Sequence, residues 1–422
     1  MLIHFLIKIN KTLSNKTVHN TLFLYLIQGL NTLLYLFVIP HIVKSIGLEL
    51  FGTLSVAIAT TSYFVIFTDY GFNFSGTRQV SVNRFDNKKL VELFSTIQTI
   101  KFVLMLISFI VLLILLQLID FLGQNRELYI LSFGLVVGKF LFPVWFFYGL
   151  EKMKIVALLT AIFRIGYAFS IVFLIRNEKD LLLIPLLNSL SVIVPGIIAF
   201  LILRFKWNIG YVWPKKAAVK RQLFEGWDLF SSSFLINFYT GSSVLVLSLF
   251  ASAETIGIFA GIEKILKAIR SMVNPISQAL FPNMAFILEK SSQNKSVLFR
   301  QVLFPILGLA LIGIAIGLTF AEQLIEVSIG HDFISMAGVL RIAIFIPLFA
   351  LLSNISGVQF LVNIGESNYY SKSVLMSSLL GILLMVGMAY WREAFGLIGA
   401  MLITEILMTV LMTRKLLKYF NR

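Results

Sequence analysis

The chain has 422 residues, of which 58% are hydrophobic and 13% charged, and its formal net charge is +15. A soluble domain is about 45–50% apolar and about 25% charged, so this composition indicates an integral membrane protein. The absence of cysteine excludes a disulfide framework, a cysteine-bound zinc cluster and thiol catalysis. Most Lys and Arg lie in short loops between apolar runs, which argues against a nucleic-acid partner.

Apolar runs of about 20 residues, the length that crosses a bilayer, recur along the whole chain. The first set lies at about 19–43, 51–75, 93–119, 128–150, 154–176 and 180–204. The second set lies at about 226–250, 255–282, 300–320, 337–362, 370–390 and 394–415. We therefore predict an all-α integral membrane protein with about twelve transmembrane helices.

The longest and most basic connection, residues 204–221, lies between the two sets and fits a cytoplasmic hinge. It predicts an N-terminal six-helix lobe (1–205), a basic linker (206–222) and a C-terminal six-helix lobe (223–422). Lys and Arg gather in every second loop, and Asp and Glu gather in the others. The positive-inside rule then places both termini in the cytoplasm.

The predicted eighth span carries charged and amide side chains near its middle. At about 100° per residue, one helical face collects Glu263, Lys267, Arg270, Asn274 and Gln278, with Lys264 at its edge. A charge at the centre of a span costs roughly 2.5–3.5 kcal/mol, so this face needs water or partners. A pair between Glu263 and Lys267 would leave Lys264 and Arg270 as surplus cations. The stripe therefore predicts the wall of a cationic, water-filled cavity.

Other interpretations of the stripe stay open. Its charges could pair with a neighbouring helix, or the segment could be a surface amphipathic helix, which the long apolar runs on both sides disfavour. Three further cations lie deep in other predicted spans and are candidates for the same cavity: Lys139, Arg164 and Arg341. Pairing of these cations with Glu405 or Asp228 is the alternative.

The sequence contains no Gly-rich phosphate loop, no metal-ligand spacing and no nucleophile–base set. Its four His residues are scattered. We therefore expect no catalytic residue, no metal and no cofactor.

The stretch Asp69–Ser81, DYGFNFSGTRQVS, closes the predicted second span. It resembles the D-x-G-x-N-x-x-G-T-R-x-V-S signature of Wzx-type polysaccharide repeat-unit flippases, members of the multidrug/oligosaccharidyl-lipid/polysaccharide (MOP) exporter superfamily. The residues that carry this signature are Asp69, Gly71, Asn73, Gly76, Thr77 and Arg78. Further similar stretches are Phe142–Lys154, Gly226–Ser233, Ala260–Pro282 and Ser353–Gly365, so the resemblance covers essentially the whole chain.

The resemblance implies a MATE-like fold with two lobes around a central lumen. It implies that undecaprenyl-pyrophosphate-linked oligosaccharide, for O-antigen, capsule or a similar polysaccharide, crosses the bacterial cytoplasmic (inner) membrane by alternating access. The implied partners are this lipid-linked substrate, membrane lipid and the polysaccharide polymerase machinery. The cations of the eighth span would meet the pyrophosphate, and the polar groups facing the sugars would include Gln28, Asn31, Asn237 and Tyr239.

Simpler roles exist for several of these residues. Arg78 lies at a predicted helix end, where Arg usually reaches the interface, and Gly71 and Gly76 favour close packing or a kink. Glu263 is either a fixed partner of Lys267 or a protonation site that couples transport to an ion gradient; we favour the partner role.

Two other functions stay open. A MATE-like drug or metabolite antiporter would need lumenal acids for cationic drugs, whereas the mid-span charge here is mostly Lys and Arg. A membrane glycan polymerase or ligase would be supported by an Arg- or His-rich outer loop, which the sequence lacks.

Overall fold

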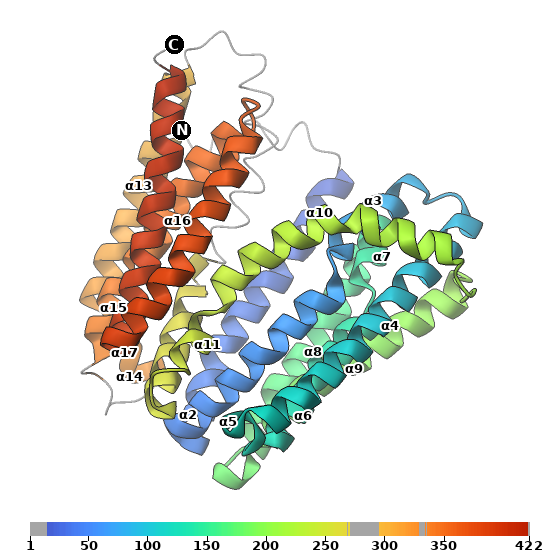
Figure 1. Ribbon diagram of the computed structural model, residues 1–422, viewed down its shortest axis with the longest axis horizontal. Helices are drawn as coiled ribbons and strands as arrows, with labels where there is room; N and C mark the ends of the chain where they lie inside the picture. Colours follow the sequence, from blue (N-terminus) through green and yellow to red (C-terminus); the bar gives the residue numbers. More distant parts are fainter. Residues whose placement is uncertain (1–14, 268, 271–294, 329–333, 335, 421–422) are drawn as a thin grey trace. The chain divides into compact units, whose positions relative to one another are not determined.

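A computed structural model describes residues 15–267, 269–270, 295–328, 334 and 336–420 (Figure 1). Every regular element among these residues is a helix. The chain divides into two compact units. The N-terminal unit comprises Ser45–Gly241 and the part of α2 up to Leu34, and the C-terminal unit comprises Ser242–Arg422 and Tyr35–Lys44.

The N-terminal unit contains α2 (Asn15–Asp69), α3 (Phe72–Val82), α4 (Asn87–Leu118), α5 (Asp120–Gly123), α6 (Arg126–Leu141), α7 (Val144–Gly149), α8 (Met153–Leu174), η1 (Glu178–Asp180), α9 (Leu183–Leu201), η2 (Ile202–Lys206) and α10 (Lys216–Gly241). Helix α2 also passes through the C-terminal unit and is interrupted at Gly47, so it consists of two helices that meet at a kink. This kink lies between the first two predicted spans. Helix α6 packs along α9, and α3 packs against α7.

The short helix α7 lies in the core of the N-terminal unit. Its sequence, VWFFYG, is apolar on all sides, which is typical of a helix without a solvent face. Trp145, Phe146 and Phe147 are completely buried. Phe94 of α4 stacks on Trp145, with ring centroids 6.3 Å apart, and meets Phe146 edge-on at 5.4 Å. These rings join α4 to α7.

The C-terminal unit contains α11 (Ser243–Leu247), a helical segment at 253–267 and 269–270, α13 (Lys295–Thr319), α14 (Ala321–Ser328), α15 (Ala337–Ala343), α16 (Phe345–Asn354), η4 (Ile355–Leu361) and α17 (Ser367–Phe420). A straight helix of the length of α17, 54 residues, would extend about 81 Å, far beyond the roughly 30 Å hydrocarbon core. The backbone is non-helical at Arg392 and Glu393, between the predicted eleventh and twelfth spans. The kink therefore separates two segments of ordinary spanning length.

Eight helices among the described residues are long and apolar enough to cross a membrane. The prediction of an all-α, multi-pass membrane protein is thus confirmed. One of the eight, Ser367–Phe420, covers two predicted spans. The predicted eighth span, 255–282, is described only as far as Arg270, so the count of twelve stays a prediction.

The basic segment before α10 is hydrogen-bonded to α4. The backbone N–H of Val212 donates to Ser95 Oγ at 2.9 Å, and the hydroxyls of Tyr211 and Thr99 lie 2.8 Å apart. Helix α10 then begins at Lys216, inside the predicted linker. The lobe boundaries at residues 205 and 223 stay predictions.

Candidate functional site

The charged stripe begins with an ion pair between Glu263 and Lys267. Both lie on the helical segment 253–267, one turn apart, and Lys267 Nζ lies 2.9 Å from Glu263 Oε2. Ser243 of α11 donates from its hydroxyl to the other carboxylate oxygen, Oε1, at 2.7 Å. The Glu263 side chain is only 7% exposed, whereas that of Lys267 is 59% exposed. Glu263 is therefore a buried carboxylate with both oxygens occupied, and Lys267 carries its charge outward.

Arg270 makes the second ion pair of the stripe. Its Nη2 lies 2.9 Å from Oε1 of Glu405, which α17 contributes. The Glu405 side chain is 8% exposed and that of Arg270 is 28% exposed. Our expectation that Arg270 would be a surplus cation was wrong, because Glu405, 135 residues away, neutralises it. One pair within a helix and one between two helices thus stabilise the stripe.

Lys264 lies beside the first pair. It interacts favourably with Glu263 and unfavourably with Lys267. The described part of the stripe thus carries three cations, Lys264, Lys267 and Arg270, and the carboxylates paired with the last two are Glu263 and Glu405. Since both carboxylates are more deeply buried than their partners, the accessible side of the stripe is cationic.

The other polar residues that we predicted for this cavity cannot be placed. Asn274 and Gln278 lie outside the described residues. The structure describes the helical backbone, but not the side chains, at Gln28, Asn31, Asn237 and Tyr239.

The three deeper cations lie on three different helices, α6, α8 and α15. Arg164 of α8 donates to Asn188 Oδ1 of α9 at 3.0 Å and is half-buried. Arg341 of α15 pairs with Glu322 of α14 at 2.7 Å, and both side chains are exposed, so its role in a cavity stays a prediction. Lys139 is also exposed.

The signature residue Asp69 pairs with a lysine that we did not single out. Lys101 of α4 is 2% exposed, and its Nζ lies 2.8 Å from Asp69 Oδ1 and 3.5 Å from the backbone oxygen of Lys139. Asn73 donates from its amide to the other oxygen of Asp69. The sequence could have pointed to this pair, because Lys101 is the one charged residue in the apolar run 93–119. A charge within a membrane span needs a partner.

The rest of the signature builds the turn between α2 and α3 and its packing on α7. Gly71 has a φ of 72°, a conformation that glycine adopts without strain, and it begins α3. A Cβ on Gly76 would lie 2.7 Å from Cε3 of Trp145, so only glycine allows this approach. Thr77 donates to the backbone oxygen of Trp145 at 3.1 Å. Arg78 is exposed. Most of the signature therefore positions helices.

No group of three or more His, Cys, Asp or Glu side chains in the described part of the chain could hold a metal ion. The acids of both ion pairs are instead occupied by Lys267 and Arg270. The arrangement can thus attract an anion by charge, and it presents no nucleophile–base set.

The described residues thus form a helical, multi-pass membrane protein with paired charges inside its apolar segments. Residues 17–288, more than half of the chain, match the model of a family described as "Polysaccharide biosynthesis protein". The chain belongs to this family.

Two relatives match almost end to end, and both are named "Putative O-antigen transporter". The protein of Escherichia coli (strain K12) is 28% identical over 396 residues, covering 93% of this chain and 95% of the relative. The protein of Shigella dysenteriae is 24% identical over 408 residues, covering 94% and 98%.

A solved structure confirms the predicted fold. The inward-facing conformation of a multidrug resistance MATE family transporter of the MOP superfamily superimposes with a TM-score of 0.70. The alignment covers 92% of this chain and 94% of that transporter, at 13% sequence identity. The chain therefore has a MATE-like fold.

Proposed function

We propose that this protein is a flippase that moves undecaprenyl-pyrophosphate-linked oligosaccharide repeat units across the bacterial cytoplasmic membrane. The family, the names of the two relatives and the MATE-like fold support this proposal. Both termini lie in the cytoplasm, and the repeat units serve O-antigen, capsule or a similar surface polysaccharide.

The observation that carries the proposal is the difference in burial within the two ion pairs. Glu263 and Glu405 are buried, while Lys267 and Arg270 are more exposed. A pyrophosphate approaching this helix meets cations first, and charge-assisted hydrogen bonds from ammonium and guanidinium groups are the strong ones. Both acids are already paired, which disfavours a site for cationic drugs.

In this mechanism the head group crosses while the polyprenyl tail stays in lipid. Lys264, Lys267 and Arg270 bind the pyrophosphate. The sugars contact amide groups and an aromatic ring from Gln28, Asn31, Asn237, Tyr239, Asn274 and Gln278. The protein alternates access between the two sides of the membrane, and no covalent bond forms or breaks. The polymerase machinery then receives the flipped repeat unit.

Glu263 serves as a fixed partner in this mechanism. Its two oxygens are engaged by Ser243 and Lys267, which lowers the cost of keeping a buried carboxylate ionised. The pair thereby holds the ammonium of Lys267 in place for the substrate.

The test is to delete the gene and analyse lipid-linked intermediates and surface polysaccharide. A flippase deletion accumulates undecaprenyl-pyrophosphate-linked repeat units and loses surface polysaccharide, and the wild-type chain restores it. Single repeat units at the cell surface would instead indicate a polymerase. Normal polysaccharide combined with drug sensitivity would indicate an antiporter, and either result would overturn the proposal.

A further inference from the structure

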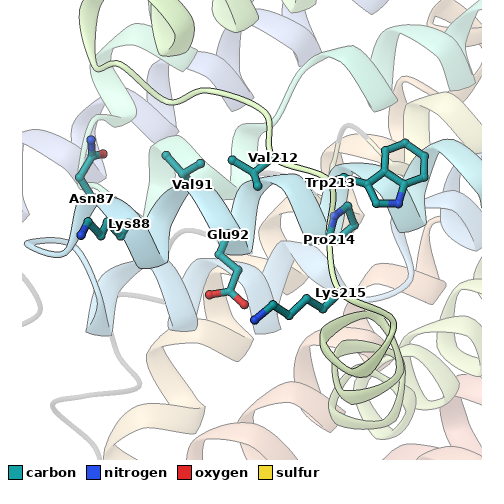
Figure 2. Close-up of a pocket in the computed structure, with 8 residues that line it drawn as sticks. All are labelled: Asn87, Lys88, Val91, Glu92, Val212, Trp213, Pro214 and Lys215. Carbon is teal, nitrogen blue, oxygen red and sulfur yellow. The ribbon is translucent and has the colours of Figure 1, made fainter.

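Two pockets adjoin the first turns of α4, one against the basic segment before α10 and the other against α3 and the start of α10. The first has a volume of about 360 Å³ and is lined by Asn87, Lys88, Val91, Glu92, Val212, Trp213, Pro214 and Lys215 (Figure 2). The second, of about 400 Å³, is lined by Gln79, Asn83, Lys89, Glu92, Leu93, Thr96, Ala218, Arg221 and Gln222. Glu92 lines both pockets, and both volumes lie in the range of small-ligand sites.

The side chains along this side of α4 change in character toward its N-terminus. Phe102 is exposed and apolar. Nearer the N-terminus, Tyr211 contacts Thr99, and Val212 is bonded to Ser95. Next comes Trp213, which is 80% exposed and lines the first pocket with Glu92.

This series of side chains ends at the first pocket, which is lined by the lysines Lys88 and Lys215. An order of apolar, aromatic and then cationic side chains is characteristic of a helix that leaves the bilayer through its interface. The pocket therefore lies at the depth of lipid head groups.

The charges around the pockets favour an anion. Lys88 and Lys215 line the first pocket, Lys89 and Arg221 line the second, and Glu92 is the one acid lining either. Figure 2 shows the Glu92 and Lys215 side chains pointing toward one another, whereas Lys88 extends away from Glu92. Each pocket thus has two cations and one acid, an excess of one positive charge.

We propose that the first pocket binds the head group of an anionic phospholipid of the phosphatidylglycerol class. Lys88 and Lys215 contact the phosphodiester, Trp213 lies at the level of the glycerol, and the acyl chains follow the exposed apolar side chains beyond Phe102. The site uses none of the residues assigned to the flippase substrate. Because the lipid touches both α4 and the segment before α10, its binding strengthens the attachment of that segment.

The test measures bound lipid by native mass spectrometry while phosphatidylglycerol is titrated into the purified full-length protein in detergent. Lys88→Gln with Lys215→Gln should weaken binding about thirtyfold, since each lysine near an anionic membrane surface contributes about a factor of five. The matched control is Lys152→Gln with Lys154→Gln. It removes the same charge from two exposed lysines at the N-terminal end of α8 and should leave binding unchanged.

Glu92→Gln should change the affinity for phosphatidylglycerol in the opposite direction. This second test stays decisive even if the double lysine variant does not fold. It removes the acid of the pocket and should tighten phosphatidylglycerol binding about fivefold by the same factor. Phosphatidylethanolamine, which carries an ammonium group, should bind more weakly to the wild-type protein.

Four results would overturn the proposal. These are equal losses in the two double-lysine variants, weaker phosphatidylglycerol binding in Glu92→Gln, displacement of the lipid by millimolar inorganic phosphate, and binding of polyprenyl pyrophosphate in preference to phosphatidylglycerol. The third would assign the pocket to a soluble anion, and the fourth to the transport substrate.

Discussion

The ammonium of Lys101 lies 2.8 Å from Oδ1 of Asp69, inside the N-terminal unit. Lys101 also reaches the backbone oxygen of Lys139, near the end of α6, so one buried cation joins the ends of α2 and α6 to the middle of α4. The first residue of the family signature therefore has a structural partner. Lys101 thereby fixes the ends of α2 and α6 relative to α4. Both helices end inside candidate membrane-spanning segments, Phe37–Val82 and Arg126–Gly149.

Lys101→Met should strongly lower the stability and membrane abundance of the protein. The variant leaves the Asp69 carboxylate, which is 24% exposed, without its cation, at a cost below the roughly 3–5 kcal/mol of a fully buried pair. Thermal unfolding of the purified protein measures the effect. Asp69→Asn combined with Lys101→Met should recover part of the loss. A double variant less stable than Lys101→Met would contradict the pairing.

Lys267→Met should destabilise the C-terminal unit more than Glu263→Gln. Loss of the lysine leaves a buried carboxylate without its ion-pair partner at 2.9 Å, whereas loss of the acid leaves an exposed ammonium that water solvates. The unfolding temperature of purified Lys267→Met should therefore lie below that of purified Glu263→Gln. Under the partner role, the double variant should regain some of the glycan display that Glu263→Gln loses. No recovery would favour the ion-coupling role.

Lys267→Ala combined with Arg270→Ala should abolish the surface-glycan display per copy of protein in the membrane, and it should also lower protein abundance, because the buried Glu263 and Glu405 lose their cations. The physical reason is loss of the exposed cations that meet the pyrophosphate. Lys415→Ala is the control, because Lys415 is a partly exposed, ion-paired cation of the same unit outside the stripe. Glycan display is measured beside immunoblots of the membrane fraction. The cationic-stripe mechanism would be falsified if the double variant displayed as much glycan per copy of protein as Lys415→Ala.

Gly76→Ala should lower stability by roughly 1–3 kcal/mol, as overpacking of a filled core does. The added Cβ would lie 2.7 Å from Trp145 and 3.2 Å from Ile97 Cδ1. Trp145→Leu in the same chain opens space and should recover part of the unfolding temperature. If Gly76→Ala alone left that temperature unchanged, α3 and α7 would not be in such close contact.

Single cysteines at Lys216 and Gln323 should be labelled from opposite sides of the membrane. The chain contains no natural cysteine, so each variant carries one reactive thiol, and both positions are exposed. Charge alternation places Lys216 in the cytoplasm and Gln323 outside. A membrane-impermeant maleimide applied to intact cells should therefore label the second alone. Labelling of both from outside would contradict the predicted span order.

The sequence alone determined the helical membrane architecture of this protein. Apolar runs of spanning length must form helices in lipid, because every backbone polar group there needs an internal partner. The kinks at Gly47 and at Arg392–Glu393 accordingly lie between predicted spans. The pair of Glu263 and Lys267 was also predictable, since residues four apart share a helical face.

The tertiary structure alone decided which distant charges meet. Nothing local links Arg270 to Glu405, 135 residues on, or Asp69 to Lys101 on the next long helix, because helix periodicity specifies a face but not the neighbour packed against it. The same limit applies to Arg341, for which the sequence suggested Glu405 or Asp228 as a partner and the structure supplies Glu322. Partner choice between helices depends on how side chains interlock across the interface, and that information is spread over the whole chain.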